Sequence, residues 1–196
     1  DGIRDIGVTG VQTCALPIYA GCDPLDFMLD LAIAENLDTV FSAVLLNSDE
    51  NAVARLLKHP ASLVSLSDAG AHLTFFNDAG FGLHLLGHWV RERGVLSLAE
   101  AVRKLTAQPA ALFGLADRGE IRPGAWADLL LFDPARVARG AKFRANDLPG
   151  GGARLLTPPV GVHGVWVNGC RVVGQEGQPV STLAGPHWPG QLLRSR

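Results

Sequence analysis

The sequence lacks the marks of several protein classes. Its 196 residues carry a formal net charge of −2, with lysine and arginine scattered along the chain, so we expect no nucleic-acid partner. No uninterrupted apolar run approaches the length of a membrane span, and no membrane partner is expected. Cysteine is scarce, and Cys22 and Cys170 lie far apart without metal-ligand spacing. We expect reduced thiols of a cytoplasmic protein, with a disulfide as the alternative.

Apolar residues, by contrast, are plentiful. Hydrophobic residues make up 47% of the chain and charged residues only 18%. This composition predicts a substantial core rather than disorder. The length suits one domain, or parts of two.

The segment Ser65–His72 carries the strongest sign of chemistry. The apolar run Leu63–Leu66 predicts a short buried strand, which ends near Asp68 and is followed by small residues. Small residues let the backbone turn sharply and leave a carboxylate accessible at the end of the strand. In α/β barrels, catalytic groups lie at the carboxyl ends of strands. The alternative is that Asp68 only caps the following segment.

The elements before residue 115 alternate as β-α-β units. Helices are expected from Asp23, from Ser48 to before Pro60, over Gly80–Arg93, and from Ser97 to before Pro109. Ser97 and Glu100 have the spacing of a capping box. Strands are expected over Val40–Leu46 and Leu63–Leu66. This alternation is typical of a parallel α/β barrel.

After Gly114 the apolar pattern becomes that of strands. Pro123-Gly124 predicts a type II turn, Ala127–Asp133 a strand, and Val165–Val173 a hairpin that turns at Asn168-Gly169. The segment Phe143–Pro159 is rich in proline and glycine and is expected to be a loop.

Several motifs together resemble the amidohydrolase superfamily of metal-dependent hydrolases. They are the stretches LTAQPAALFGL at 105–115, RGEIRPG at 118–124, ADLLLFD at 127–133 and VWVNG at 165–169. The stretches SDAGAH at 67–72 and GHWVRE at 87–92 are similar to the N-acyl-D-amino-acid deacylase (D-aminoacylase) branch. The resemblance covers about Tyr19 to the C-terminus.

The resemblance implies a fold and two regions. Residues 19–115 would form the last β/α units of a (β/α)8 TIM barrel. Residues 116–196 would form the C-terminal part of a small β-sandwich. The class expected for the chain is therefore α/β.

The resemblance also implies a reaction. A divalent metal, usually zinc, would activate a water molecule, and Asp68 would take its proton and pass it to the departing amine nitrogen. Asp68 is thus expected to be catalytic first and a metal ligand second. The implied substrate is a small N-acyl amino acid or related linear amide. A cyclic amide, as in hydantoinase- or dihydroorotase-like enzymes, is the enzymatic alternative.

Other polar residues have weaker claims to function. His72 and Ser67 are candidates for substrate binding, and His72 also for orienting Asp68; an ordinary loop histidine is the alternative. His84 and His88 share one helical face at a spacing that can bind zinc, but packing or a substrate-loop role is favoured. Asp128 is expected to satisfy backbone groups. Asn77 and Asp78 line the mouth of the site or form a polar turn.

Two features suggest that the chain is a C-terminal fragment. Val8–Ile18 is similar to the in-frame translation of a common sequencing adapter, so residues 1–18 are interpreted as non-native, and their removal should leave the fold unchanged. The sequence also has no His-x-His pair, the usual metal motif of the superfamily. The chain alone is therefore expected to be an inactive partial scaffold that retains no zinc. Its oligomeric state is not predicted.

Overall fold

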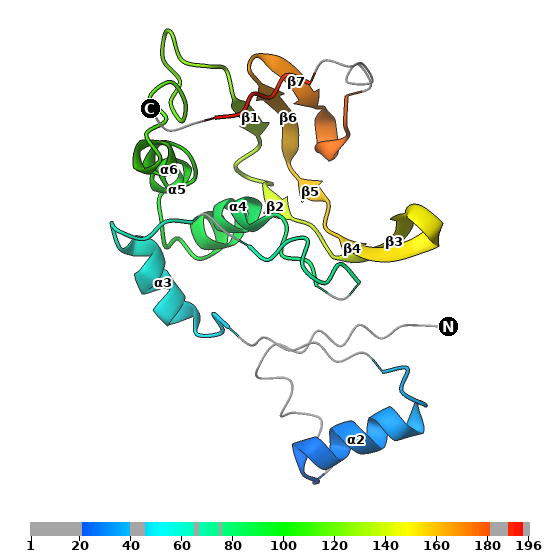
Figure 1. Cartoon of the computed structure of the whole chain (residues 1–196). Helices are drawn as coiled ribbons and strands as arrows, with labels where there is room; N and C mark the ends of the chain where they lie inside the picture. Colours follow the sequence, from blue (N-terminus) through cyan, green and yellow to red (C-terminus); the bar gives the residue numbers. More distant parts are fainter. Residues whose placement is uncertain (1–20, 40–45, 65–66, 75, 181–187, 194–196) are drawn as a thin grey trace. The chain divides into compact units, whose positions relative to one another are not determined.

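The computed structural model describes residues 21–39, 46–64, 67–74, 76–180 and 188–193 (Figure 1). The chain divides into two compact units, Asp1–Val53 and Ala54–Arg196. Residues 1–18 and most of the strand expected over Val40–Leu46 lie outside the described residues. The division expected near residue 115 stays a prediction.

Helix α2 (Pro24–Ala34) begins where the sequence predicts. The Asp23 carboxylate accepts hydrogen bonds from the backbone amides of Leu25, at 2.8 Å, and Asp26, at 3.4 Å, and Pro24 occupies the first helical turn. Its apolar side chains are open in the structure: Leu25 is 57% exposed and Ile33 74%.

Helix α3 (Glu50–Lys58) lies within the segment from Ser48 to before Pro60 where a helix is expected. The Asp49 carboxylate accepts from the amides of Asn51 and Ala52, at 2.9 and 3.1 Å. Past Pro60, Leu63 and Val64 are half-buried but are not in a strand. Ser65 and Leu66 lie outside the described residues.

The helix expected over Gly80–Arg93 consists of two parts. An α-helical turn, α4 (Phe81–His84), continues as the π-helix η1 (Leu85–Glu92). The wider turn is visible at its end, where the amide of Arg93 donates to the carbonyl of His88. Leu85, Leu86 and Trp89 are buried.

The next helix begins at a complete capping box and ends earlier than predicted. In α5 (Leu98–Leu105) the Ser97 hydroxyl accepts from the amide of Glu100, whose carboxylate accepts from the amide of Ser97 at 2.8 Å. The break falls at Thr106, and Pro109 lies in the first turn of α6 (Ala107–Leu112). Proline is tolerated there because first-turn amides have no partner within the helix.

The strands of the described residues form three antiparallel sheets. Strand β1 (Leu129–Phe132) pairs with β6 (Val162–Val167), which pairs with β7 (Cys170–Val173). Strands β2 (Ala138–Arg139) and β5 (Pro159–Val160) form a second pair. The predicted turns are confirmed: Gly124 has a φ of 83°, and Asn168 and Gly169 have φ values of 49° and 79°, as a type I′ hairpin requires.

The prediction of a loop over Phe143–Pro159 is wrong. Strands β3 (Phe143–Leu148) and β4 (Gly152–Leu156) form a hairpin, joined by the short 3-10 helix η2 (Pro149–Gly151). Gly150 and Gly151, inside the segment expected to be a loop, have φ values of 73° and 75°. Glycine adopts this left-handed conformation without steric cost, so these residues form the hairpin turn.

The core of the second unit lies where η1 packs with α5 and with β2. Its buried apolar members include Leu85, Leu86, Trp89, Ala101, Val137 and Val162. Gly87 permits the close approach of η1 to β2, because a Cβ there would lie 2.6 Å from the carbonyl oxygen of Val137. The Arg91 guanidinium donates to the same oxygen.

The described residues form both helices and strands, which agrees with the expected α/β class. The described residues contain no parallel strand pair, so the barrel and the sandwich stay predictions. No described helix combines the length and apolarity needed to cross a membrane.

Candidate active site

Asp68 lies in an exposed tight turn. Its carbonyl accepts the amide of Ala71 at 2.9 Å, and Gly70 has a φ of 95°. The amide of Ala69 donates to the Ser67 hydroxyl at 3.3 Å, so Ser67 rather than Asp68 satisfies it. Among the described residues no hydrogen bond or ion pair of the Asp68 carboxylate is recorded, and the side chain is open to solvent. This placement suits an accessible proton acceptor.

His72 closes the same turn in an unusual conformation. It is exposed and has a φ of 49°, and its carbonyl accepts the amide of Phe76 at 3.0 Å. Left-handed backbone is uncommon for residues other than glycine, although histidine is among those that adopt it more often. The structure thus brings Ser67, Asp68 and His72 into one turn. Their roles in chemistry stay predictions.

Two side chains, one from α5 and one from α6, hold residues 59–62 ahead of Asp68. Lys104 is 6% exposed, and its ammonium donates to the carbonyls of His59, at 3.1 Å, and Ser62, at 3.0 Å. The Gln108 amide donates to the carbonyls of Pro60 and Ser62, at 3.0 and 3.2 Å. Helices α5 and α6 therefore hold the segment that precedes the turn.

His84 and His88 pack against each other. Their rings stack with centroids 4.9 Å apart and planes 10° apart, and both meet Trp89 edge-on. The His88 Nδ1 atom lies 3.0 Å from a Glu92 carboxylate oxygen. Hydrogen bonds from His88 and then Arg91 lower the pKa of the Glu92 carboxyl. This arrangement agrees with the favoured packing role.

The described residues do not by themselves form a metal site. They contain no group of three or more histidine, cysteine, aspartate or glutamate side chains placed to hold an ion. Asp68 alone offers too few ligands for zinc, which usually takes four.

A cavity of about 410 Å³ lies elsewhere in the second unit. Lys58, Glu100, Arg103 and Lys104 line it, and Asp68 and His72 do not. It is therefore separate from the turn that carries the predicted catalytic residue.

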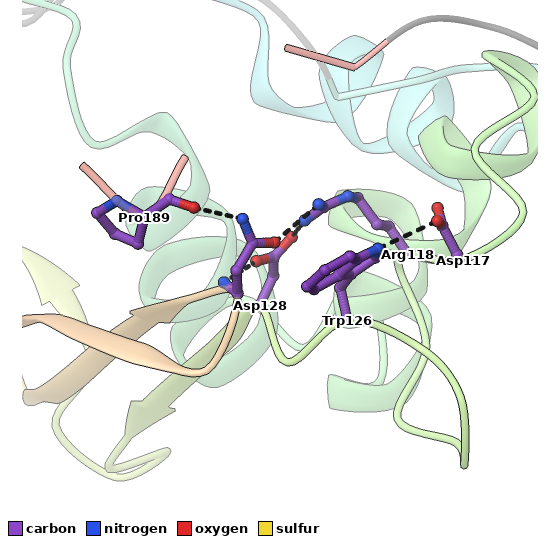
Figure 2. A network of polar contacts seen from close by, with 6 residues as sticks. Asp117, Arg118, Trp126, Asp128 and Pro189 are labelled. Atoms are coloured by element: carbon purple, nitrogen blue, oxygen red, sulfur yellow. Dashed lines mark hydrogen bonds and ion pairs between the residues drawn. The ribbon is translucent and has the colours of Figure 1, made fainter. Parts of the chain in front are cut away.

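Asp128 occupies a polar network at the start of β1 (Figure 2). Its carboxylate pairs with the guanidinium of Arg118 and accepts the backbone amide of Asn168 at 2.8 Å. Arg118 also donates to the Asn168 side chain at 2.8 Å and lies over the Trp126 ring, 5.5 Å from its centroid. The predicted structural role of Asp128 is confirmed.

The same network includes a residue near the C-terminus, Pro189. The Trp126 indole donates to the Asp117 carboxylate at 3.2 Å, and the Asn168 amide donates to the carbonyl of Pro189 (Figure 2). Through these hydrogen bonds, residues 117–128 connect the segment after α6 with the β6–β7 turn. The turn in turn contacts Pro189, near the C-terminus.

Comparison with known families identifies the chain. The family model described as amidohydrolase family matches residues 10–173. The chain belongs to this family, which confirms the resemblance seen in the sequence.

Curated relatives of the chain include proteins named as deacylases and an aminoacylase. An N-acyl-D-glutamate deacylase of Alcaligenes xylosoxydans xylosoxydans is 38% identical over 207 residues, covering 99% of this chain and 37% of that protein. A D-aminoacylase of the same organism is 42% identical over 88 residues, covering 45% of this chain and 16% of that protein. The chain therefore spans little more than a third of the length of this N-acyl-D-glutamate deacylase.

One similar solved structure is the N-acyl-D-glutamate deacylase from Bordetella bronchiseptica, complexed with zinc and a phosphonate inhibitor. It is 39% identical with a TM-score of 0.37, covering 50% of this chain and 19% of that chain.

Proposed function

We propose that this chain is part of a metal-dependent hydrolase that cleaves the linear amide of N-acyl-D-amino acids. The observation that carries the proposal is the 38% identity to an N-acyl-D-glutamate deacylase across 99% of the chain. The exposed turn at Asp68 supports it, because it presents a carboxylate at the position that the family resemblance assigns to catalysis.

Asp68 would act as the proton shuttle. Its carboxylate accepts a proton from the attacking water as general base and delivers it to the amine nitrogen as general acid. Delivery is essential in amide cleavage, because an unprotonated amine anion is a very poor leaving group. His72 and Ser67 would assist by orienting Asp68 or by binding substrate.

A divalent metal, zinc by family resemblance, would supply a nucleophilic water in the longer protein. Since the described residues do not form a metal site, the other ligands would have to come from the rest of that protein. Asp68 would serve as a ligand only in addition to its role as a base.

In the proposed architecture, residues 19–115 belong to the last β/α units of a (β/α)8 barrel, and residues 116–196 to a β-sandwich. The antiparallel sheet of β1, β6 and β7 supports the second assignment.

The decisive experiment uses the longer gene product. The upstream DNA is recovered, and the protein is assayed with N-acyl-D-glutamate, other N-acetyl-D-amino acids, their L-enantiomers and hydantoins. We expect metal-dependent release of the free D-amino acid. Hydrolysis of hydantoins with none of N-acyl-D-amino acids would replace the proposal by a cyclic-amide hydrolase.

A second candidate is that the 196-residue chain alone is a non-catalytic scaffold. Large apolar side chains on its surface favour this: Ile33 is 74% exposed, Leu131 53% and Ile121 92%, and open apolar surface promotes aggregation. We expect poor solubility and no turnover. A soluble, cooperatively unfolding monomer with metal-dependent amidase activity would contradict this candidate.

A further inference from the structure

The loop that follows Asp68 is hydrogen-bonded to a strand that is distant in sequence, β4. Residues 67–74 and 76–80 form no strand or helix, yet the amide of Leu155, in β4, donates to the carbonyl of Leu73 at 2.9 Å. The loop therefore continues the β3–β4 hairpin by one hydrogen bond. A single exposed bond of this kind would hold the loop only weakly.

Asn77 supplies the stronger attachment. Its side-chain amide donates to the carbonyl of Leu155 at 3.0 Å and to the hydroxyl of Thr157 at 3.1 Å. Its side-chain oxygen accepts the amide of Ala79 at 2.8 Å. Asn77 is only 5% exposed. Since a buried polar group without its partners costs stability, these bonds favour one loop position over others.

Leu155 lies in β4, within the β3–β4 hairpin. Leu155 is paired across the hairpin with Arg144. Beside it, Arg154 forms two hydrogen bonds of 2.7 Å with the carboxylate of Asp147. This pairing raises the pKa of the Arg154 guanidinium and lowers that of the Asp147 carboxyl. The Arg154 and Asp147 side chains are 35% and 45% exposed, so this pair is an exposed one that contributes little to the stability of the hairpin.

Asp68 consequently lies between two anchors. On the side before it, Lys104 and Gln108 hold the carbonyl of Ser62. On the side after it, Asn77 holds the loop to β4. The turn itself is exposed, and these attachments hold the chain on either side of it.

We infer that Asn77 is a positioning residue for Asp68: by tying the loop to β4, it fixes the place of the carboxylate in the active site. This rests on the proposed function for its catalytic consequence, though not for the anchoring. It also gives the β3–β4 hairpin a role in the reaction, through the loop that it holds.

The test begins with hydrogen–deuterium exchange on the longer protein that contains this chain. Asn77→Asp keeps the size of the side chain and its acceptor for Ala79, and removes both bonds that the amide donates. We expect exchange in peptides covering residues 67–80 to accelerate by about tenfold or more, in line with the loss of buried hydrogen bonds. Thr157→Val, which removes one acceptor, should give a smaller increase, and Thr157→Ser should restore wild-type exchange.

Arg154→Gln is the matched control. It breaks the exposed pair with Asp147 on the same hairpin and leaves Asn77 and its partners in place. It should loosen the hairpin tip without accelerating exchange in residues 67–80. Unchanged exchange in that segment on Asn77→Asp, or an equal increase with Arg154→Gln, would overturn the inference whatever the activity of the longer protein.

The kinetic arm uses the longer protein. A misplaced catalytic group slows chemistry more than binding, so Asn77→Asp should lower kcat by about ten- to a hundredfold with little change in KM. Arg154→Gln should leave both constants near wild type. An inactive wild-type protein would reject the proposed function alone, because the exchange result decides the anchoring independently. Accelerated exchange with unchanged kcat would reject the positioning role.

Discussion

Arg118 and Asp128 form an ion pair at the start of β1, in which only 8% of the Arg118 side chain is exposed against 35% for Asp128. The guanidinium is thus shielded from water and depends on this carboxylate for its countercharge. Replacing Asp128 should therefore harm the fold more than an exposed ion pair would predict.

Asp128→Asn is expected to lower the free energy of unfolding by about 2 kcal/mol, because it leaves a shielded cation without its anion. Denaturant unfolding measures this loss. Asp117→Asn is the control, since an asparagine oxygen can still accept from the Trp126 indole, and it should cost much less. Equal losses in the two variants would contradict the assigned role.

Asp68→Asn addresses the proposed chemistry in the longer protein. The change keeps the shape of the side chain and removes the proton acceptor, so turnover should fall by about two to four orders of magnitude. The melting temperature should hardly change, because the exposed carboxylate makes no recorded stabilising contact within the described residues. His72→Ala should give a milder loss of rate. Near-normal turnover in the Asn variant would remove Asp68 from the mechanism.

The capping box of α5 offers a prediction on stability. Ser97→Ala removes the hydroxyl that accepts the amide of Glu100 and should cost about 1 kcal/mol of unfolding free energy. Ser97→Thr keeps the hydroxyl and should recover most of the loss. A loss of the same size with Thr would assign the effect to packing rather than to the cap.

The same capping box should be sensitive to acid. Hydrogen bonds from the Ser97 hydroxyl and then its backbone amide hold the pKa of Glu100 below its ordinary value. The charged carboxylate therefore stabilises the fold above the unfolded-state pKa of about 4.3, and this contribution is lost as pH falls through the lower folded-state pKa. The stability gap between wild type and Glu100→Gln should narrow across that range. A gap independent of pH would refute the linkage.

Gly87→Ala tests the close packing of η1 on β2. Alanine favours helices, but its Cβ would lie 2.6 Å from the carbonyl oxygen of Val137, so we expect a net loss of about 1–3 kcal/mol. At Gly82, in α4, the same substitution meets only Leu105 methyl groups at 3.7 Å and should be neutral or slightly stabilising. Thermal unfolding of both variants makes the comparison. A neutral Gly87→Ala would argue against the close approach.

Features set by neighbouring residues could be predicted from the sequence. Asp23, Asp49 and Ser97 cap helices through bonds to amides two or three residues away, and Asn168-Gly169 specifies its turn through backbone conformation. The Phe143–Leu156 hairpin escaped prediction because its glycines resemble a loop while its pairing depends on a partner strand.

Features set by distant residues could not be predicted. Asn77 meets Leu155 and Thr157 from a remote part of the chain, and no local pattern marks such a contact. Lys104 is similar, since its helical position predicts an exposed side chain and only the fold brings two carbonyls to it. The π-helical turns of η1 likewise have no simple sequence signature. For the candidate site, the sequence located the Asp68 turn but not its supports.

Asn168 meets two separate requirements with one side chain. Its left-handed backbone suits the hairpin turn, while its amide joins Arg118 to the carbonyl of Pro189 and its backbone amide meets Asp128. Glycine would adopt the left-handed backbone of the turn equally well but would lose both side-chain hydrogen bonds. Glutamine would keep an amide group but would adopt the left-handed conformation poorly. Substitution at this position is therefore constrained twice over, so a relative that carries glycine there should have changed its partners as well.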